Sequence, residues 1–404
     1  MKHKTLYGLI AWSLCTFSVG NVYARIKLIT LPVREHVEIQ LENENTTIIE
    51  EERIVPLRKG VNDIDFSWHN TSIRPETIVF RVLNDTEALA VNVLSVSYPP
   101  NESALTWKVS ASQNGSARVR ITYAITGLNR TYHYIVRANN DETKMAMTQY
   151  VKINNQSGES FPDADINTGS GEKVILPMGL NETQEFLNQK YNAVPIDKTY
   201  TVNAAELGYR NRAEDKLNVL MHYQLHNDRQ HNLGKHSLAP GKFRIYQQDK
   251  EGTAVFVGED WGNYTAREDE SKLFIGQARD IVVKRVIERK KRQRINGNLY
   301  NIDAVVRYEI ENFKDKPVNL IIEESLPFLR NEVFPPGQRT SYNNDMNHAI
   351  EWEIGDETSF SGKPLKKLTS SQKIAYQISL PARNAHAKVV KLEKKLNINF
   401  NNEW

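Results

Sequence analysis

The chain has 404 residues, with 52 Lys and Arg against 49 Asp and Glu, and a single cysteine. A net charge of +3 is too small for a nucleic-acid binder, which normally presents a strongly basic domain. One cysteine excludes both an internal disulfide and a metal site built from several thiolates. A chain of this length can bury a large core without such cross-links and is typical of two or three domains.

The first 24 residues have the pattern of a secretory signal peptide. Lys2 and Lys4 give a cationic start, an apolar run follows, and Val22 and Ala24 occupy the positions that a signal peptidase reads. The apolar run is well short of the roughly 20 residues that a membrane-spanning helix needs. We therefore expect export to the periplasm or cell surface, with cleavage near Ala24 and Arg25.

The single cysteine, Cys15, lies inside this leader. Leu14 stands where a lipoprotein cleavage site needs a small residue, so we expect no lipid anchor. The mature chain then has no cysteine and a formal charge of about +1, since two lysines leave with the leader. No later stretch is long and apolar enough for a transmembrane helix, and we expect no membrane span after cleavage.

Apolar residues recur at every second position along most of the mature chain, the pattern of strands that bury one face. Polar turns rich in Asn, Gly, Pro and Asp separate these runs. The sequence therefore predicts an all-β protein of tandem antiparallel β-sandwich domains, immunoglobulin or fibronectin-like, with one short linker helix. The alternating sets are Ile64, Phe66 and Trp68; Leu105, Trp107 and Val109; Val119, Ile121 and Tyr123; Tyr132, Tyr134 and Val136; Ile302 to Ile310; Ile350, Trp352 and Ile354; and Ile374, Tyr376 and Ile378.

A helix is predicted in one place, from Asn181 to Tyr191. Asn181 suits a helix N-cap, Gln184 completes a capping box, and Phe186 and Leu187 supply a small apolar face. This segment separates two β-rich regions, so it is expected to be the linker.

The expected domain plan places a signal peptide at 1–24, an N-terminal β-sandwich region at 25–180, the linker at 181–198 and a C-terminal β-sandwich region at 199–404. Pro99, Pro100 and Asn101 offer a further break, because consecutive prolines cannot serve a central strand. The N-terminal region is thus either one sandwich or two units split near residues 99–101.

Several turn and strand-edge motifs resemble the bacterial domain of unknown function 4139 family, some of whose members are called mucoidy inhibitor A-like. The motifs are Tyr123 to Leu128, Tyr132 to Val136, Asp141 to Thr143, Asn154 to Glu159 with its Ser-Gly-Glu turn, Leu238 to Gln247, Phe256 to Asp260, Thr265, Glu268 to Glu270 and Leu273 to Gly276. Many relatives have a tryptophan where this chain has Asn129 and Arg130, and the long coiled coil of some relatives is missing. The resemblance implies an exported multi-sandwich protein and no particular chemistry.

Four histidines, His222, His226, His231 and His236, suggest a metal site by their proximity in sequence. On a strand, however, His222 and His226 would stand roughly 13 Å apart, too far for one ion. We interpret all four as solvent-facing strand and loop residues.

Two short segments resemble ion-binding loops without matching them. Asp163, Asp165, Asn167 and Gly169 imitate the start of a calcium loop, but Thr168 stands where that loop needs glycine. Residues 169–173 lack the spacing of a phosphate loop and are read as a turn. The acidic loop Glu259, Asp260, Glu268, Asp269 and Glu270 is interpreted as a solvated hairpin.

No catalytic motif, metal-binding helix or redox pair occurs, and no cofactor is implied. The predicted function is that of an exported, non-enzymatic envelope protein with a binding or scaffold role. The alternative is a hydrolase or other enzyme acting on envelope polymers, since glycoside hydrolysis needs only two carboxylates at the right separation in space.

A basic run after the apolar residues 281–283 is the one candidate contact surface. It precedes Asn296 and Gly297, a strong hairpin signal. A protruding cationic hairpin would contact anionic envelope polymers or lipid headgroups, whereas the alternative is a solvated strand end balanced by nearby acids. The expected partner of the protein is an envelope protein or an anionic envelope polymer. The run consists of Lys284, Arg285, Arg289, Lys290, Lys291, Arg292 and Arg294.

Overall fold

The computed structural model describes residues 28–43, 46–83, 89–204, 216–297, 299–333, 350–383 and 390–403. The predicted leader, residues 1–24, lies outside them. The chain divides into two compact units, and each is assembled from several separate stretches. Unit 1 comprises Met1–Leu128, Asn155–Asn167 and Lys173–Glu182, and unit 2 comprises Asn129–Asn154, Thr168–Glu172 and Thr183–Trp404. Residues 129–154 and 168–172, expected in the N-terminal region, thus belong to unit 2.

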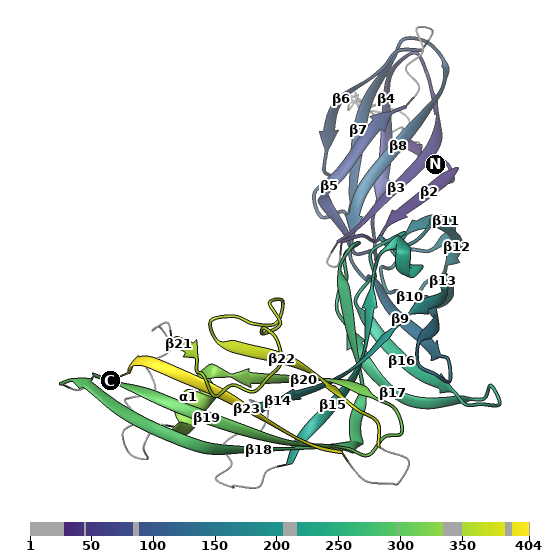
Figure 1. Cartoon of the computed structure of the whole chain (residues 1–404). Coiled ribbons are helices and arrows are strands. Elements are labelled where there is room, and N and C mark those ends of the chain that lie inside the picture. Colours follow the sequence, from purple (N-terminus) through teal and green to yellow (C-terminus); the bar gives the residue numbers. More distant parts are fainter. Residues whose placement is uncertain are drawn as a thin grey trace, which may run out of the picture. The chain divides into compact units, whose positions relative to one another are not determined.

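Unit 1 consists of two sheets (Figure 1). The first has the order β1 (Leu28–Thr30), β4 (Gly60–Ser67), β7 (Ala104–Ala111) and β6 (Val91–Ser97). The second has the order β12 (Val174–Met178), β11 (Phe161–Asn167), β2 (His36–Gln40), β3 (Thr47–Leu57), β8 (Gly115–Ile125) and β5 (Ile73–Val82).

Aromatic side chains join the two sheets of unit 1. Phe66 of β4 lies 5.7 Å from Trp107 of β7 and 5.8 Å from Tyr123 of β8, measured between ring centroids. Phe80 of β5 lies 4.8 Å from Trp107. Trp107 and Tyr123 are buried, as their alternating patterns predicted. Ring pairs at these separations stabilise a core beyond the area that they bury.

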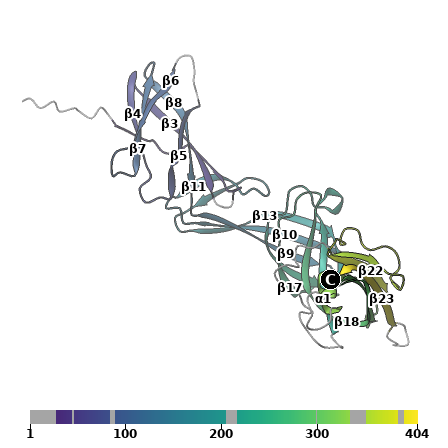
Figure 2. The ribbon, with the colours of Figure 1, turned by 90° about the vertical axis from the view of Figure 1, so that its left-hand side faces the viewer.

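Unit 2 also has two sheets. The five-stranded sheet has the order β13 (Thr183–Pro195), β10 (Lys144–Asn155), β9 (Leu128–Ala138), β16 (Gly241–Gln248) and β17 (Ala254–Gly262), and only the end residues Leu128 and Asn155 belong to unit 1. Figure 2 shows β13, β10 and β9 running side by side. The eight-stranded sheet has the order β21 (Glu351–Ile354), β23 (Val390–Glu403), β19 (Leu299–Asn312), β18 (Glu270–Asn296), β15 (Lys216–His226), β14 (Asp197–Asn203), β20 (Val318–Ser325) and β22 (Lys373–Leu380).

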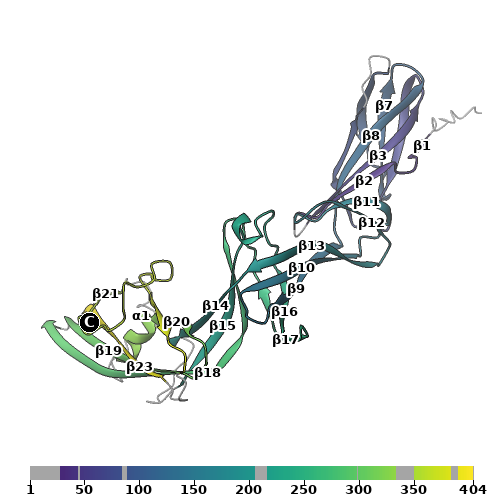
Figure 3. The same ribbon diagram turned by 45° about the vertical axis from the view of Figure 1, so that its right-hand side comes forward.

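The eight-stranded sheet curves around the helix α1 (Leu326–Val333), which lies on the concave side of β18, β19 and β23 (Figure 3). Leu326, Leu329 and Val333 of α1 belong to the same buried cluster as the alternating residues of β19. The helix therefore supplies the cover that a single curved sheet needs for its apolar face. Among the described residues, no helix is long and apolar enough to cross a membrane.

The all-β prediction is confirmed, but the sheets are not wholly antiparallel and an immunoglobulin or fibronectin-like arrangement is not confirmed. Within the described residues, each sheet contains one parallel pair: β1 with β4, β2 with β11, β9 with β16 and β14 with β20. Alternation of side chains is the same in both kinds of pairing, so it could not distinguish them.

The predicted linker helix from Asn181 to Tyr191 is wrong. This stretch enters β13, which pairs with β10 along most of its length. Asn181 instead lies in the preceding turn with a φ of 55°. Phe186 and Leu187 pack as strand residues because long-range pairing with β10 outweighs a weak local helix signal.

The possible break at Pro99 and Pro100 is a turn inside one sheet. It joins β6 to β7, and these two strands pair with each other. Asn101 occupies the turn with a φ of 62°. The alternation at β21 also differs from expectation, because Trp352 is half-buried and Ile354 is 40% exposed on this short edge strand.

Candidate functional site

The Ser-Gly-Glu turn, residues 157–159, is held in unit 1 by side-chain hydrogen bonds and close backbone packing. The amide of Asn155, a buried side chain, donates to the carbonyl of Glu159 at 2.7 Å, and its oxygen accepts from the Ser157 hydroxyl at 2.7 Å. Gly158 has a φ of 82°, and a Cβ there would stand 2.1 Å from the carbonyl oxygen of Asn70. Only glycine fits such a turn without displacing the backbone.

This turn places Glu159 in a buried ionic network. Glu159 accepts from the guanidinium of Arg34 at 2.6 Å and from the Tyr123 hydroxyl at 2.8 Å. Arg34 also contacts Glu51, which is fully buried and accepts a second bond from Arg53 at 2.9 Å. Burial, together with Glu51 and Glu159, raises the pKa of the Tyr123 phenol. The carboxylates are satisfied by arginines, so the turn motif has a structural role.

The predicted basic hairpin exists. β18 and β19 pair antiparallel up to Asn296 and Leu299, and Gly297 in the turn has a φ of 52°. Residues 290–297 are exposed, and the five residues from Lys290 to Arg294 contain four cations and no acid. The turn chemistry that predicted this hairpin is therefore the chemistry found there.

Arg285 is not part of any contact surface, because it lies in the core of unit 2. It donates twice to Glu324 at 2.9 Å and also to Glu332 at 2.7 Å. The Tyr308 hydroxyl donates to the same Glu324. Although burial opposes it, the charge of Glu324 holds the pKa of Arg285 well above its usual value. The sequence shows only a run of basic residues, so it could not distinguish the buried Arg285 from the exposed Lys290 to Arg294.

The remaining basic residues are divided between two faces. A β-bulge between Ile287 and Arg289 shifts the pairing of β18 by one residue. Beyond it, Lys290, Arg292 and Arg294 stand opposite Ala304, Ile302 and Tyr300, which are buried residues of β19. Because side chains alternate across a sheet, Lys291 lies on the other face. The run therefore forms a cationic tip and not a single continuous stripe.

Several of these cations already have partners. Arg289 contacts Asp303 at 2.7 Å and Glu357 at 2.6 Å. The guanidinium of Arg292 lies 3.3 Å from the ring centroid of Tyr300, and Arg294 donates to the carbonyl of Gly297 at 2.7 Å. Lys284 is half-buried, whereas Lys290 and Lys291 are exposed and make no ion pair with the described residues. The two lysines are the cations most available to a partner.

The four histidines are only partly solvent-facing. The rings of His226 and His231 lie 4.8 Å apart between centroids, beside Glu270 and Asp228 respectively. His222 packs against Phe274, and burial, aided by the nearby Lys272, lowers its pKa to about 4. Burial likewise lowers the pKa of His236. Within the described residues, no cluster of three or more His, Cys, Asp or Glu side chains could hold a metal ion.

The segments that resemble ion-binding loops are strand ends and turns. Asp163 and Asp165 lie on β11, where Asp165 faces His36 across the parallel pairing with β2. Asn167 ends the same strand, and Gly169 has a φ of 78° in the turn that follows. These acids lie along a strand that is flanked by β12 and β2, and no metal-binding cluster of the described residues includes them.

The acidic loop is divided among separate partners. Glu259 pairs with Lys242 at 2.7 Å, and Asp260 accepts from the backbone N–H of Phe274 at 2.7 Å. Glu270 contacts Lys367 at 2.6 Å. Glu268 and Asp269 are exposed. The sequence pattern suggested a solvated hairpin for these acids. It missed that Asp260 holds the backbone of β18 at Phe274.

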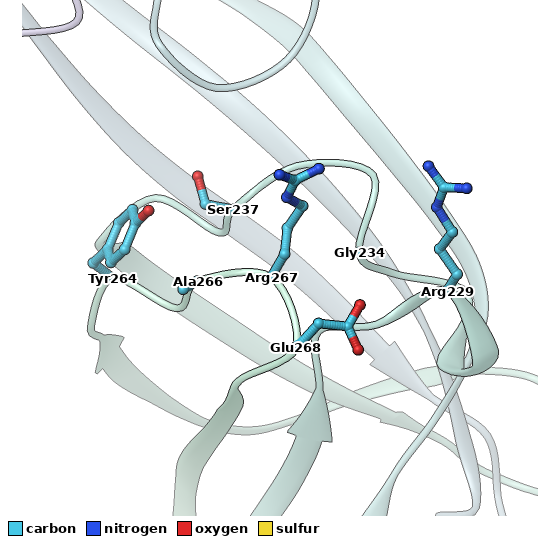
Figure 4. Close-up of a pocket in the computed structure, with 7 residues that line it drawn as sticks. All are labelled: Arg229, Gly234, Ser237, Tyr264, Ala266, Arg267 and Glu268. Carbon is cyan, nitrogen blue, oxygen red and sulfur yellow. The ribbon is translucent and has the colours of Figure 1, made fainter.

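A pocket of about 720 Å³ lies in unit 2, between the loop 227–240 that follows β15 and the loop 263–269 that follows β17 (Figure 4). Its lining includes Arg229, Ser237, Tyr264, Arg267 and Glu268. In the figure both guanidinium groups lie above the loops that carry them. Sequence reasoning missed these arginines, because isolated charges in loops carry no periodic signal. The only hint was that both loops contain motifs from the resemblance.

The two loops are held together from inside by Asn227, which is fully buried. Its amide donates to the carbonyls of Thr265 at 3.2 Å and Ala266 at 2.9 Å, and its oxygen accepts from the N–H of Gly234 at 2.9 Å. Leu238 and Thr265 add a β-bridge. Buried polar groups with all their bonds made fix a single arrangement of the backbone, so the pocket walls are preformed.

The motif Leu238 to Gln247, which resembles the family, includes most of strand β16 and has a packing role. A Cβ at Gly241 would stand 2.4 Å from the carbonyl oxygen of Tyr132, so this position needs glycine for the close approach of β16 to β9. The rings of Tyr134 and Phe243 stack at 4.0 Å, and the Tyr134 hydroxyl donates to the carbonyl of Ala239 at 2.8 Å. The motif therefore packs the five-stranded sheet and fixes the base of the loop.

The family model of a domain of unknown function, DUF4139, matches residues 119–355, more than half of the chain. The chain belongs to the DUF4139 family. The matched stretch contains the Ser-Gly-Glu turn, both pocket loops and the basic hairpin. No curated protein matches the chain. The predicted family is thus confirmed, while the finer likeness to mucoidy inhibitor A-like members stays a prediction.

Proposed function

We propose that this DUF4139 protein is an exported, non-enzymatic component of the bacterial cell envelope with a binding or scaffold role. Its contact surface is the tip of the β18–β19 hairpin, which binds an anionic envelope polymer or an acidic face of an envelope protein. The leader supports export, because its charge and apolar pattern are those of a cleaved signal peptide.

The observation that carries the binding role is the concentration of charge at the hairpin tip. Residues 290–294 contain four exposed cations without an acid, on the last stretch of β18 before the turn at Gly297. Each exposed cation near an anionic surface contributes about 1 kcal/mol. Lys290 and Lys291 present this charge on both faces of the hairpin, which suits a flexible polymer that can follow either face.

The binding role is tested with the double variant Lys290→Ser/Lys291→Ser, which leaves Arg292 stacked on Tyr300. Retention on isolated envelope material and on immobilised polygalacturonate at low salt should weaken about thirtyfold, because two contacts of about 1 kcal/mol are removed. The salt dependence should become flatter, and the melting temperature should not change.

The matched control is Lys363→Ser/Lys366→Ser, which removes the same charge from two exposed lysines of unit 2. It should retain the binding of the wild type. Equal losses in both variants would mean that net charge alone governs retention. Soluble fragments released from envelope material by the wild type would favour the hydrolase alternative.

Export is tested on the same fractions. The protein recovered from the envelope fraction should begin at Arg25 or within a few residues of it, as measured by mass spectrometry of the intact chain. A protein that retains Met1 in a clean envelope fraction would contradict the proposed localisation.

A further inference from the structure

The pocket between the loops 227–240 and 263–269 has cations that the protein itself does not neutralise. Arg229 and Arg267 are exposed and line the pocket, yet neither makes an ion pair with the described residues. Other exposed or half-buried arginines, such as Arg118 and Arg383, pair with carboxylates. Arg81 and Arg279 are exposed without an ion pair among the described residues, but neither lines the pocket. Two unpaired guanidinium groups over one concavity favour an anionic ligand.

Arginine selects among anions by its shape. Its planar group donates two parallel hydrogen bonds to a carboxylate or phosphate, a geometry that a spherical ion does not match. Ser237 and Tyr264 add hydroxyl groups at the pocket wall, and the Tyr264 ring is 62% exposed. A volume of about 720 Å³ holds a small molecule with room for ordered water. The lining therefore suits a hydroxylated ring that carries an oxyanion.

We propose that this pocket binds an oxyanion group, a carboxylate or a phosphate, on a small hydroxylated ring such as a sugar acid or a sugar phosphate. Arg229 and Arg267 bind the oxyanion, Ser237 exchanges hydrogen bonds with ring hydroxyls, and the ring lies against Tyr264. The site is separate in sequence and surface from the hairpin tip, so it goes beyond the proposed function.

Glu268 is the one acidic residue in the lining of the pocket among the described residues. Its carboxylate lines the same pocket, where it lies below the two guanidinium groups in Figure 4, and it forms no ion pair with either arginine. A negative charge at this place repels an anionic ligand, while two positive charges attract it. Removal of the acid and removal of the arginines must therefore change anion affinity in opposite directions.

The test is calorimetric titration of the full chain with three ligands that share a pyranose ring: glucuronate, glucose 6-phosphate and glucose. At least one of the two anions should bind at low salt, and neutral glucose should bind at least tenfold more weakly. Binding of glucuronate alone identifies a carboxylate ligand, and binding of glucose 6-phosphate alone identifies a phosphate ligand.

Three variants complete the test. Arg229→Gln/Arg267→Gln should lower anion affinity at least tenfold, and Glu268→Gln should raise it two- to fivefold. Lys363→Ser/Lys366→Ser, which removes two exposed lysines that line neither the pocket nor the hairpin tip, should bind the anions as the wild type does. The proposal is overturned if no anion binds, if glucose binds as well as the anions, or if the double arginine variant binds unchanged.

Discussion

Each unit of the molecule contains a partly buried cluster of the same kinds of group: one arginine, two glutamates and a tyrosine. In unit 1, Arg34 contacts Glu51 and Glu159, and Tyr123 donates to Glu159. In unit 2 the corresponding residues are Arg285, Glu324, Glu332 and Tyr308. In both, the tyrosine ring also belongs to the apolar core, so each network ties an ionic cluster to the packing of its sheet.

The two networks differ in charge balance. Unit 1 adds Arg53, which contacts Glu51, so two cations meet two carboxylates. Unit 2 has Arg285 alone against two carboxylates. The arginine side chain is also more buried in unit 2, with 4% of its surface exposed against 20% for Arg34. A buried ion pair stabilises a fold only when each charge is compensated, so Arg285 is the more critical residue.

The largest expected effect comes from Arg285→Met, which leaves the fully buried Glu324 without a cation. This variant should lower the free energy of unfolding by about 3–5 kcal/mol, the usual cost of breaking a buried pair. Arg34→Met should cost clearly less, since Arg53 still neutralises Glu51. Calorimetric and urea unfolding of both variants gives the comparison.

The double variant Arg285→Met/Glu324→Leu tests whether the uncompensated charge of Glu324 causes the loss of stability. An apolar pair of similar volume removes the uncompensated charge, so most of the lost stability should return. Equal losses from the two single arginine variants would show that charge balance does not distinguish the units. A double variant as unstable as Arg285→Met would point to packing instead.

The smallest expected effect concerns pH. Burial, with the nearby charge of Glu324, raises the pKa of Glu332 above its ordinary value of 4.5 even though Arg285 opposes the shift. The folded protein therefore holds this proton more tightly than the unfolded chain does. The resulting stabilisation is complete below pH 4.5 and is lost as the pH rises through the folded pKa.

Glu332→Gln removes this titration. Relative to the wild type, the variant should become more stable as the pH rises from about 4.5 towards neutrality. Melting temperatures of both proteins across this range measure the difference. Parallel pH profiles would show that Glu332 does not titrate between the folded and unfolded states in this window.

The sequence predicted those parts of the molecule that depend on local chemistry. Alternation identified buried faces such as Val119 to Tyr123, and the Asn296-Gly297 pair identified the hairpin, because both signals arise from neighbouring residues. The predicted helix at Asn181 failed since pairing with β10 is a long-range interaction. The short helix α1 was missed because its eight residues give too short a pattern.

The candidate site was less predictable than the fold. Arg285 and Lys290 look alike in sequence, and the bulge between Ile287 and Arg289 leaves both opposite the same face of β19. Arg285 is nevertheless buried against Glu324, whereas Lys290 is exposed. Arg229 and Arg267 come from two loops that tertiary contacts, through Asn227 and through the bridge between Leu238 and Thr265, bring together. Single-sequence patterns contain no information on such convergence.

The parallel pair in each sheet also sets the order in which the chain can fold. Strand β2 pairs with β11 through Glu38 and Asp165, and β9 pairs with β16 through Tyr134 and Phe243, so these two sheets each close over more than a hundred residues. Closing such long loops costs entropy before any contact offsets it, and folding rates fall accordingly. Unit 1 therefore cannot complete its six-stranded sheet before β12 has been made, and unit 2 cannot complete its eight-stranded sheet before β23, the last strand of the described residues, has been made.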